Sequence, residues 1–244
     1  TMTDLANRGY RAIAIDLPPM GLSDRSLTMD YSRQAQALRI LAFVEAADIR
    51  PVIVAHSIGA AAAAEAFLAD PEAFQGAVIV AGGLMLGEDG RARQLPWPLR
   101  PVGMREAAIA ATVTNPHINR WLFGRFVHRR SAVTDDHIAS VRYPYTRKNT
   151  TETLARLLPT LILPSRGAAS TDPARYAGLD IPVALIWGRE DSVTPPDQAV
   201  ALQRALGQTA LYWLEDVGHM PQVEAPEDFH NALAMALAGL ADPT

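Results

Sequence analysis

Three side chains with complementary chemistry each follow a short apolar run of this sequence. They are Ser57, Asp191 and His219. A serine hydroxyl is a poor nucleophile near neutral pH unless an imidazole accepts its proton, and that imidazole needs an acid to hold its tautomer and stabilise its charge. These three residue types are therefore what covalent catalysis by a serine requires, provided that the fold brings them together.

The apolar runs before these residues are typical of buried strands in a parallel sheet. They are Val52–His56, Pro182–Trp187 and Ala210–Leu214, and Gly76–Ala81 is a further run of the same kind. In open parallel sheets, catalytic groups gather at the carboxyl ends of the strands. We therefore expect the three loops to meet at one edge of one sheet.

Segments with helical spacing alternate with these strands. They are Tyr31–Ile49, Ile58–Leu68, Asp197–Leu206 and Ala225–Leu240, and Arg11–Ile15 is an additional strand candidate. Strands that alternate with helices predict an α/β fold with a mostly parallel sheet, flanking helices and right-handed crossovers.

The pattern changes over residues 84–172, where prolines, arginines and aromatic residues interrupt helical segments such as Arg105–Val113 and Asn119–Val127. No clear buried-strand run occurs there. We predict a core domain made of residues 1–83 and 173–244, with residues 84–172 inserted as a helical lid.

Composition excludes several classes of function. The chain has 244 residues, 49% of them hydrophobic, a formal net charge of −4 and no cysteine. The acidic balance disfavours nucleic acid as a partner, and the absence of cysteine excludes disulfides and thiolate chemistry. No apolar run is long enough to span a bilayer, and the first residues do not resemble a signal peptide. We expect a soluble, cytoplasmic protein whose oligomeric state is open, a homodimer included.

No cofactor or metal is predicted. Gly82, Gly83 and Gly87 lack the spacing of a dinucleotide-binding loop, and no histidine pair has metal-ligand spacing. The basic run 128–130 is interpreted as a solvated surface rather than an anion site.

Four motifs together resemble those of the α/β-hydrolase superfamily. AHSIG resembles the nucleophile elbow, DLPPMGLSD resembles a structural loop, IPVALIWGRED resembles the acid-bearing strand, and VGHMPQVEAPEDF resembles the histidine loop. Ser57, Asp191 and His219 also follow one another in the chain order of this fold. The chain is identified as similar to the lid-bearing esterases of the superfamily.

This resemblance implies a serine hydrolase that cleaves a small ester through an acyl-enzyme. Ser57 would be the nucleophile, His219 the general base and Asp191 the acid that orients it. The backbone N–H of Ile58, next after the nucleophile, would donate to the oxyanion.

The sequence departs from the family pattern at three places. Ala55 and Pro19 stand where the elbow and the structural loop usually have glycine. The opening residues TDLANRGY resemble the helix that follows a His-Gly oxyanion loop in relatives, so the first strands and that loop are expected to be missing from this sequence. A fragment is one explanation of this.

Each functional interpretation has a structural alternative. Ser57 could cap a helix, Asp191 could form a turn, and His219 could lie on the surface. Glu190 is a rival acid, and Asp89 is a more distant one.

Residues near the site are expected to supply an apolar pocket for an acyl or aromatic group. The candidates are His56, Trp97, Trp121, Phe123, Phe126, Tyr143 and Tyr145. His56 could instead face into the packing of the sheet, and the aromatic residues could form the lid's own core.

Other reactions use the same three residues. A carbon–carbon bond hydrolase and a perhydrolase are alternatives to the esterase, and a ligand-binding or receptor-like homologue with little turnover is a further one. Haloalkane and epoxide hydrolysis are disfavoured because they need a carboxylate at the position of Ser57.

Overall fold

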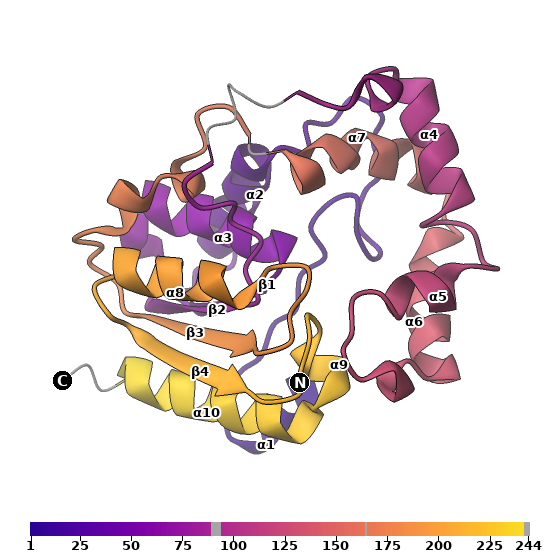
Figure 1. Cartoon of the computed structure of the whole chain (residues 1–244). Helices are drawn as coiled ribbons and strands as arrows, with labels where there is room; N and C mark the ends of the chain where they lie inside the picture. Colours follow the sequence, from indigo (N-terminus) through magenta and orange to yellow (C-terminus); the bar gives the residue numbers. More distant parts are fainter. Residues whose placement is uncertain (89–93, 164, 242–244) are drawn as a thin grey trace.

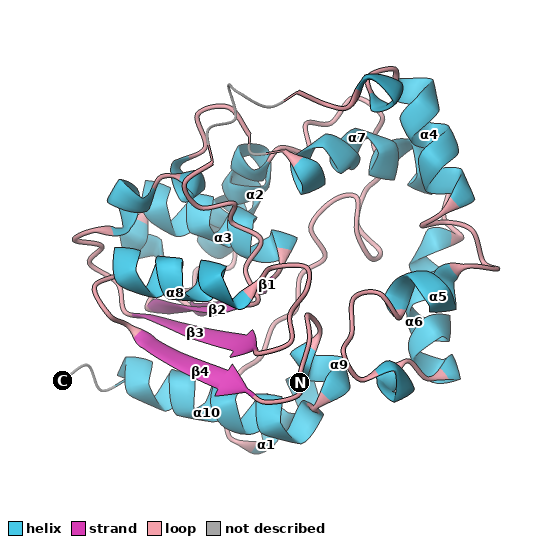
Figure 2. Ribbon diagram, in the orientation of Figure 1, coloured by secondary structure: helices cyan, strands magenta, loops and turns pink. Residues whose placement is uncertain are grey.

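A four-stranded parallel sheet forms the centre of the computed structural model, which describes residues 1–88, 94–163 and 165–241. Its strands lie in sequence order and are β1 (Val52–His56), β2 (Gly76–Val80), β3 (Val183–Gly188) and β4 (Ala210–Leu214). All neighbouring pairs are parallel (Figure 2). Every residue of β2 and β3 is buried, which explains why these two runs are apolar throughout.

Helices cover both faces of the sheet (Figure 1). One face carries α2 (Arg33–Ala46), α3 (Ile58–Ala69) and α8 (Pro196–Ala205), and the other carries α10 (Pro226–Ala241) and α1 (Met2–Asn7). The run of alanines in α3 is buried, so its small side chains let this helix lie close to β1 and α2. This close packing fixes the position of the turn between β1 and α3.

Residues 84–172, here called the helical segment, join β2 to β3. Its helices are α4 (Val102–Ala111), α5 (Asn119–Phe123), α6 (Asp135–Tyr145) and α7 (Thr150–Ile162), and its described part contains no strand. The segment lies on the side toward which the carboxyl ends of β3 and β4 point (Figure 1). The short helix α9 is Pro221–Glu224, and 3-10 helices occur at Pro71–Ala73, Trp97–Leu99, Arg130–Ala132, Ala169–Thr171 and Pro173–Tyr176.

The strand predicted at Arg11–Ile15 is wrong. This segment belongs to no strand, and no backbone hydrogen bond of a sheet joins it to the described residues. The side chains of Ile13 and Ile15 are 45% and 41% exposed. A strand requires a neighbour that supplies its ladder hydrogen bonds, and local apolar character cannot replace that neighbour. β1 is correspondingly the last strand on this side of the described sheet, and its Val54 is 40% exposed.

Candidate active site

Ser57 lies in a sharp turn between β1 and α3. Its backbone has φ +53° and ψ −122°, a conformation that residues other than glycine rarely adopt. Gly83 packs against this turn: its N–H donates to the Ser57 carbonyl over 2.9 Å, and a Cβ at Gly83 would lie 3.3 Å from the same carbonyl. The Ser57 side chain makes no capping bond to α3. Its hydroxyl therefore remains free to contact another side chain.

That side chain is the imidazole of His219. Ser57 Oγ lies 2.8 Å from His219 Nε2, and His219 Nδ1 lies 2.9 Å from Asp191 Oδ2. Because the carboxylate can only accept, Nδ1 carries the ring proton and Nε2 is free to accept from the serine hydroxyl. The Asp191 side chain is fully buried and that of His219 is 4% exposed. The structure thus brings the three predicted side chains into one hydrogen-bonded row.

The Asp191 carboxylate is held by the turn that follows it. Oδ1 accepts from the N–H groups of Val193 (2.8 Å) and Thr194 (2.9 Å), and Oδ2 accepts from the Thr194 hydroxyl over 2.7 Å. The Thr194 carbonyl accepts in turn from the indole N–H of the buried Trp187. Burial alone raises the pKa of Asp191, but the hydrogen bonds from His219 and Thr194 outweigh it and hold the pKa below its usual value.

Of the two rival acids, only Glu190 is among the described residues, and its side chain forms no hydrogen bond to this row. The neighbouring Glu190 is exposed, although its backbone N–H donates to the Val217 carbonyl. Asp89 lies outside the described residues. Of the acids considered, the geometry therefore favours Asp191.

Ile58 is the first residue of α3, directly after Ser57. A donor at this position has no acceptor within its own helix, and the positive end of the helix dipole lies at the same place. The Ile58 N–H is thus able to donate to a negatively charged oxygen bound beside Ser57.

His56 faces the histidine loop rather than a substrate pocket. Its Nε2 lies 2.7 Å from the His219 carbonyl oxygen, to which it must donate, and the two rings lie 5.0 Å apart. Burial is the main reason that the pKa of His56 falls to about 4, so the ring is neutral at neutral pH. This contact makes His56 a support for the loop that carries His219.

The aromatic residues predicted for the pocket differ in their surroundings. The ring of Phe126 lies 6.4 Å from that of His219, and the ring of Phe123 lies 6.4 Å from that of Phe126. Tyr145 packs on a small cluster at α4 and α7, to which Ile58 also belongs. These three residues are therefore the ones that lie toward the site.

The other three aromatic residues point into solvent. Trp97, Trp121 and Tyr143 are 78%, 66% and 67% exposed. Short helices that pack on one another leave one face of each helix in water, and these side chains lie on such faces.

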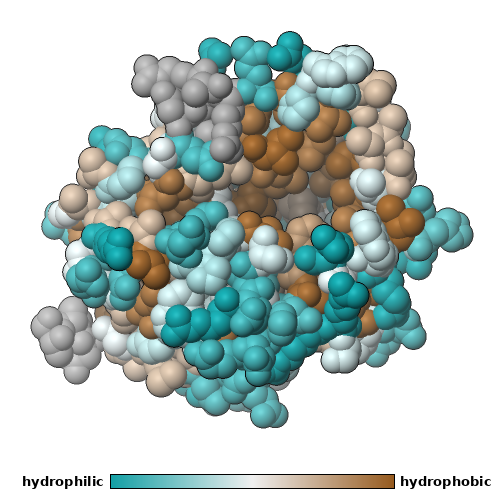
Figure 3. All heavy atoms as spheres, in the orientation of Figure 1, coloured by the Kyte–Doolittle hydropathy of each residue, from teal (hydrophilic) through white to brown (hydrophobic). Residues whose placement is uncertain are grey.

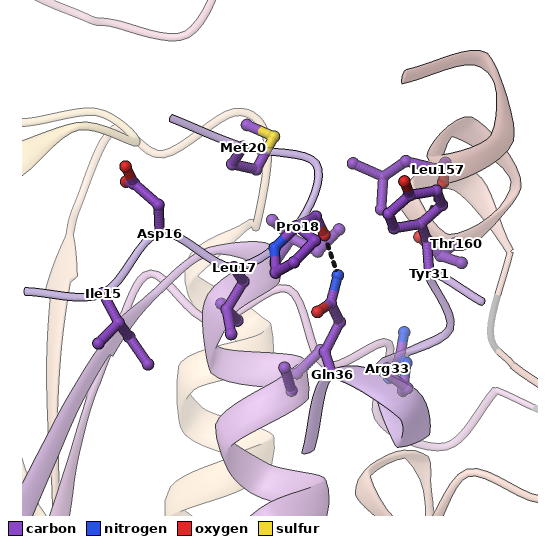
Figure 4. A pocket seen from close by; sticks show the side chains of 14 residues that line it. Ile15, Asp16, Leu17, Pro18, Met20, Tyr31, Arg33, Gln36, Leu157 and Thr160 are labelled. Carbon is purple, nitrogen blue, oxygen red and sulfur yellow. Dashed lines mark hydrogen bonds between the residues drawn. The ribbon is translucent and has the colours of Figure 1, made fainter. Parts of the chain in front are cut away.

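A cavity of about 220 Å³ opens beside Ile58, and its lining is mainly apolar. None of the predicted pocket residues lines it. Its walls are the loop after Ile15, the first turns of α2 and α3, and α7, with Leu17, Met20 and Leu157 among the side chains that face it (Figure 4). In the orientation of Figure 1, apolar side chains gather over α7 and border a hollow (Figure 3).

Two buried polar residues of this region were missed in the sequence. Thr194 holds the Asp191 carboxylate, and Glu224 accepts backbone hydrogen bonds from the loop around His219. The sequence nevertheless contains a signal for each of these two residues. Thr194 stands three residues after the predicted acid, where a turn places a hydroxyl against a carboxylate, and Glu224 is part of the histidine motif.

Neither a metal site nor a membrane helix is found in the described ranges. No three His, Asp or Glu side chains there are grouped so as to hold a metal ion. No described helix combines the length and the apolar composition that crossing a bilayer requires.

Comparison with known proteins agrees with this architecture. An uncharacterized hydrolase, YugF, of Bacillus subtilis (strain 168) is 26% identical in an alignment 227 residues long, which covers 89% of this chain and 77% of that protein. A 2-hydroxy-6-oxononadienedioate/2-hydroxy-6-oxononatrienedioate hydrolase of Paraburkholderia xenovorans (strain LB400) is 25% identical over 96% of this chain and 78% of its own length.

Solved structures share the fold. A meta-cleavage product hydrolase from Pseudomonas fluorescens IP01 superimposes with a TM-score of 0.76 and 21% identity, over 99% of this chain and 84% of that one. The model of the alpha/beta hydrolase family matches residues 1–232. With this match over most of its length, the chain belongs to the alpha/beta hydrolase family.

Proposed function

We propose that this hydrolase cleaves a small, apolar or aromatic carboxylic ester, with Ser57, His219 and Asp191 as its catalytic residues. The observation that carries the proposal is the unbroken row from the serine hydroxyl through the imidazole to the buried carboxylate. A surface histidine or a helix-capping serine would not need such a row.

The reaction follows from the donors and acceptors in the row. Ser57 Oγ attacks the ester carbonyl carbon while His219 Nε2 accepts its proton, and the Asp191 carboxylate stabilises the imidazolium that forms. The carbonyl oxygen becomes negatively charged and accepts from the Ile58 N–H. The tetrahedral intermediate then expels the alcohol, which takes the proton from His219 and leaves an acyl-enzyme. Water attacks that ester by the same steps and releases the acid and free Ser57.

The apolar cavity beside Ile58 supports an apolar substrate. Leu17, Met20 and Leu157 offer contacts to an aliphatic or aromatic group bound next to the nucleophile. The helical segment would act as a lid on a core made of residues 1–83 and 173–244, since it lies at the carboxyl ends of the strands.

Hydrolysis of a carbon–carbon bond is the second candidate. The relative from Paraburkholderia xenovorans is named as a hydrolase of 2-hydroxy-6-oxononadienedioate, and it aligns with almost the whole chain. The same serine chemistry serves both reactions, so the substrate pocket decides between them.

Nitrophenyl esters of increasing acyl length test the ester proposal directly. Ser57→Ala should reduce their turnover by about 10⁴-fold or more, because the nucleophile is removed. A fluorophosphonate probe should label the wild type at Ser57 but not the variant. Ser140→Ala on the exposed side of α6 is the matched control and should keep full activity. Unchanged ester turnover in Ser57→Ala would refute the proposal, and turnover of dienoate substrates alone would favour the second candidate.

A further inference from the structure

Glu224 is a buried carboxylate that the proposed serine chemistry does not use. It ends α9, five residues beyond His219, and is only 6% exposed. Among the described residues it forms no ion pair. A buried carboxylate is costly unless hydrogen bonds replace its lost hydration, so its donors show what the residue is for.

Four backbone N–H groups donate to Glu224. Oε2 accepts from Gly218 (3.0 Å), His128 (2.7 Å) and Arg129 (3.0 Å), and Oε1 accepts from Met220 (3.1 Å). Gly218 and Met220 flank His219, whereas His128 and Arg129 belong to the helical segment. The Glu224 carboxylate therefore binds the backbone before and after His219 and, at the same time, the backbone of the helical segment.

The backbone of His219 itself is bound in the same way. Its N–H donates to the Phe126 carbonyl over 3.2 Å, and its carbonyl accepts from His56 Nε2. The Arg129 guanidinium also donates to the Asp216 carbonyl over 2.9 Å. Residues 126–129 and 216–220 are thus joined by hydrogen bonds on both sides of the imidazole.

The packing around Glu224 leaves no room for a side chain at Gly218. A Cβ there would lie 2.6 Å from the His128 nitrogen and 3.0 Å from Glu224 Oε1. The backbone nitrogen cannot move without breaking its bond to the carboxylate. The glycine before the histidine therefore serves the contact between the histidine loop and the helical segment.

We propose that Glu224 is a positioning residue, which fastens the histidine loop to the helical segment and so sets the position of His219 Nε2 against Ser57 Oγ. This inference rests on the proposed serine hydrolase function and extends it to a residue that touches neither substrate nor reacting atoms. Hydrogen bonds to an ionised acceptor are short and strong, which suits a carboxylate better than a neutral group for this role. A movement of the helical segment would therefore directly change the position of the His219 imidazole.

Two substitutions separate positioning from general stability. Glu224→Ala removes all four acceptor contacts, and misplacement of a catalytic group by about 1 Å can cost on the order of 10²-fold in rate. We expect kcat for nitrophenyl esters to fall by about 10²-fold, with KM changed less than about threefold, at a temperature where circular dichroism shows folded protein. In Glu224→Gln the amide oxygen can replace Oε2 and keep three donors, so kcat should fall only about fivefold.

Glu227→Gln is the matched control, since Glu227 is exposed in the first turn of α10. It should leave kcat and KM unchanged. If folded Glu224→Ala keeps the wild-type kcat, the positioning role is refuted and the residue only stabilises the fold. If Glu224→Ala does not fold, Glu224→Gln decides, and a kcat equal to that of Glu227→Gln refutes the role.

A substrate-independent measurement distinguishes failure of this inference from failure of the proposed function. The 1H NMR resonance of the proton between His219 Nδ1 and Asp191 Oδ2 should shift or broaden in Glu224→Ala and stay in place in Glu227→Gln. If the fluorophosphonate probe fails to label wild-type Ser57, the hydrolase proposal fails, and this resonance still reports whether Glu224 positions the imidazole. An unchanged resonance in folded Glu224→Ala overturns the inference.

Discussion

The loops after β3 and β4 differ sharply from the helical segment in how their side chains are held. In the loops, Asp191, Thr194 and His219 are buried, and each forms hydrogen bonds with another of them. In the helical segment, the large aromatic residues Trp97 and Trp121 point into water. The strands fix the ends of their loops through a continuous ladder, whereas the helices of the segment have no such ladder and are held by packing and by single hydrogen bonds to other parts of the chain.

The same difference explains why functional residues can be inferred from the sequence at strand ends but not on the helices of the segment. A residue at the end of a buried strand has one direction in which to point, so its neighbours can be inferred from the sequence. A residue on a helix has a direction that depends on which face is covered, and the sequence of the helical segment did not reveal that face. If this contrast holds, substitutions around the loops should have larger effects than substitutions of exposed residues in the helical segment.

The largest effect is expected at the acid. Asp191→Asn should lower kcat/KM for ester hydrolysis by about 10⁴-fold, because an amide no longer holds His219 in the tautomer that leaves Nε2 free to accept. Glu190→Gln, one residue earlier and exposed, should change kcat/KM less than twofold. If Glu190→Gln lost activity and Asp191→Asn kept it, Glu190 would be the acid. The contrast between the loops and the helical segment would then fail at the acid.

The next effect is on stability and comes from His56. Its pKa in the folded protein, about 4, is below the value near 6.5 of the unfolded chain. Between these pH values the unfolded state binds more protons, so this contribution to stability is complete above pH 6.5 and is lost as the pH falls toward 4. Wild-type protein should lose about 2 to 3 kcal/mol more than His56→Gln between pH 7 and pH 4.5.

Urea unfolding at the two pH values measures this difference. Groups other than His56 titrate in both proteins and cancel in the comparison. Equal losses in the wild type and the variant would show that His56 is not held neutral by its surroundings.

A smaller effect is expected at Thr194. Thr194→Val keeps the shape of the side chain but removes the hydroxyl that donates to Asp191 Oδ2. We expect kcat to fall about tenfold, since one of the bonds that orient the carboxylate is lost. Thr194→Ser keeps the hydroxyl and should retain most of the activity. A valine variant with full activity would show that the backbone N–H groups alone orient the acid.

The smallest effect is expected in the helical segment. Trp121→Ala should change the free energy of unfolding by less than about 0.5 kcal/mol and kcat by less than twofold, because the side chain is largely in solvent. Phe126→Ala, in the same segment but beside the His219 ring, should raise KM or lower kcat clearly more. A large rise in KM for Trp121→Ala would mean that this residue reaches the substrate when it binds, and the contrast would then hold only for the free protein.

Much of the sheet could be predicted from the sequence. The ends of β1 and β4 coincide with the predicted runs, and α2, α3, α8 and α10 differ from the predicted helices by no more than three residues at either end. The prediction at Arg11–Ile15 was wrong because an apolar, β-branched run shows only that a strand is possible, and pairing depends on a neighbour elsewhere in the chain. The family itself could be recognised because its motifs stand at the strand ends, where local sequence and geometry are tightly linked.

The roles of Ser57, Asp191 and His219 stay a prediction, although the structure brings their side chains together. Thr194 and Glu224 could not be assigned beforehand, since both act through contacts that the chain forms only after folding. The apolar cavity was unpredictable for the same reason, as its walls come from four separate segments.

The sequence by itself determined the alternation of buried strands and helices, and with it the edge at which the serine, the acid and the histidine had to appear. Periodicity and short motifs are local properties, so they could be read without coordinates. Tertiary structure alone decided which polar groups surround the imidazole, which aromatic residues face water, and how Glu224 joins two distant loops. These features depend on hydrogen bonds between segments almost a hundred residues apart, for which no local pattern exists.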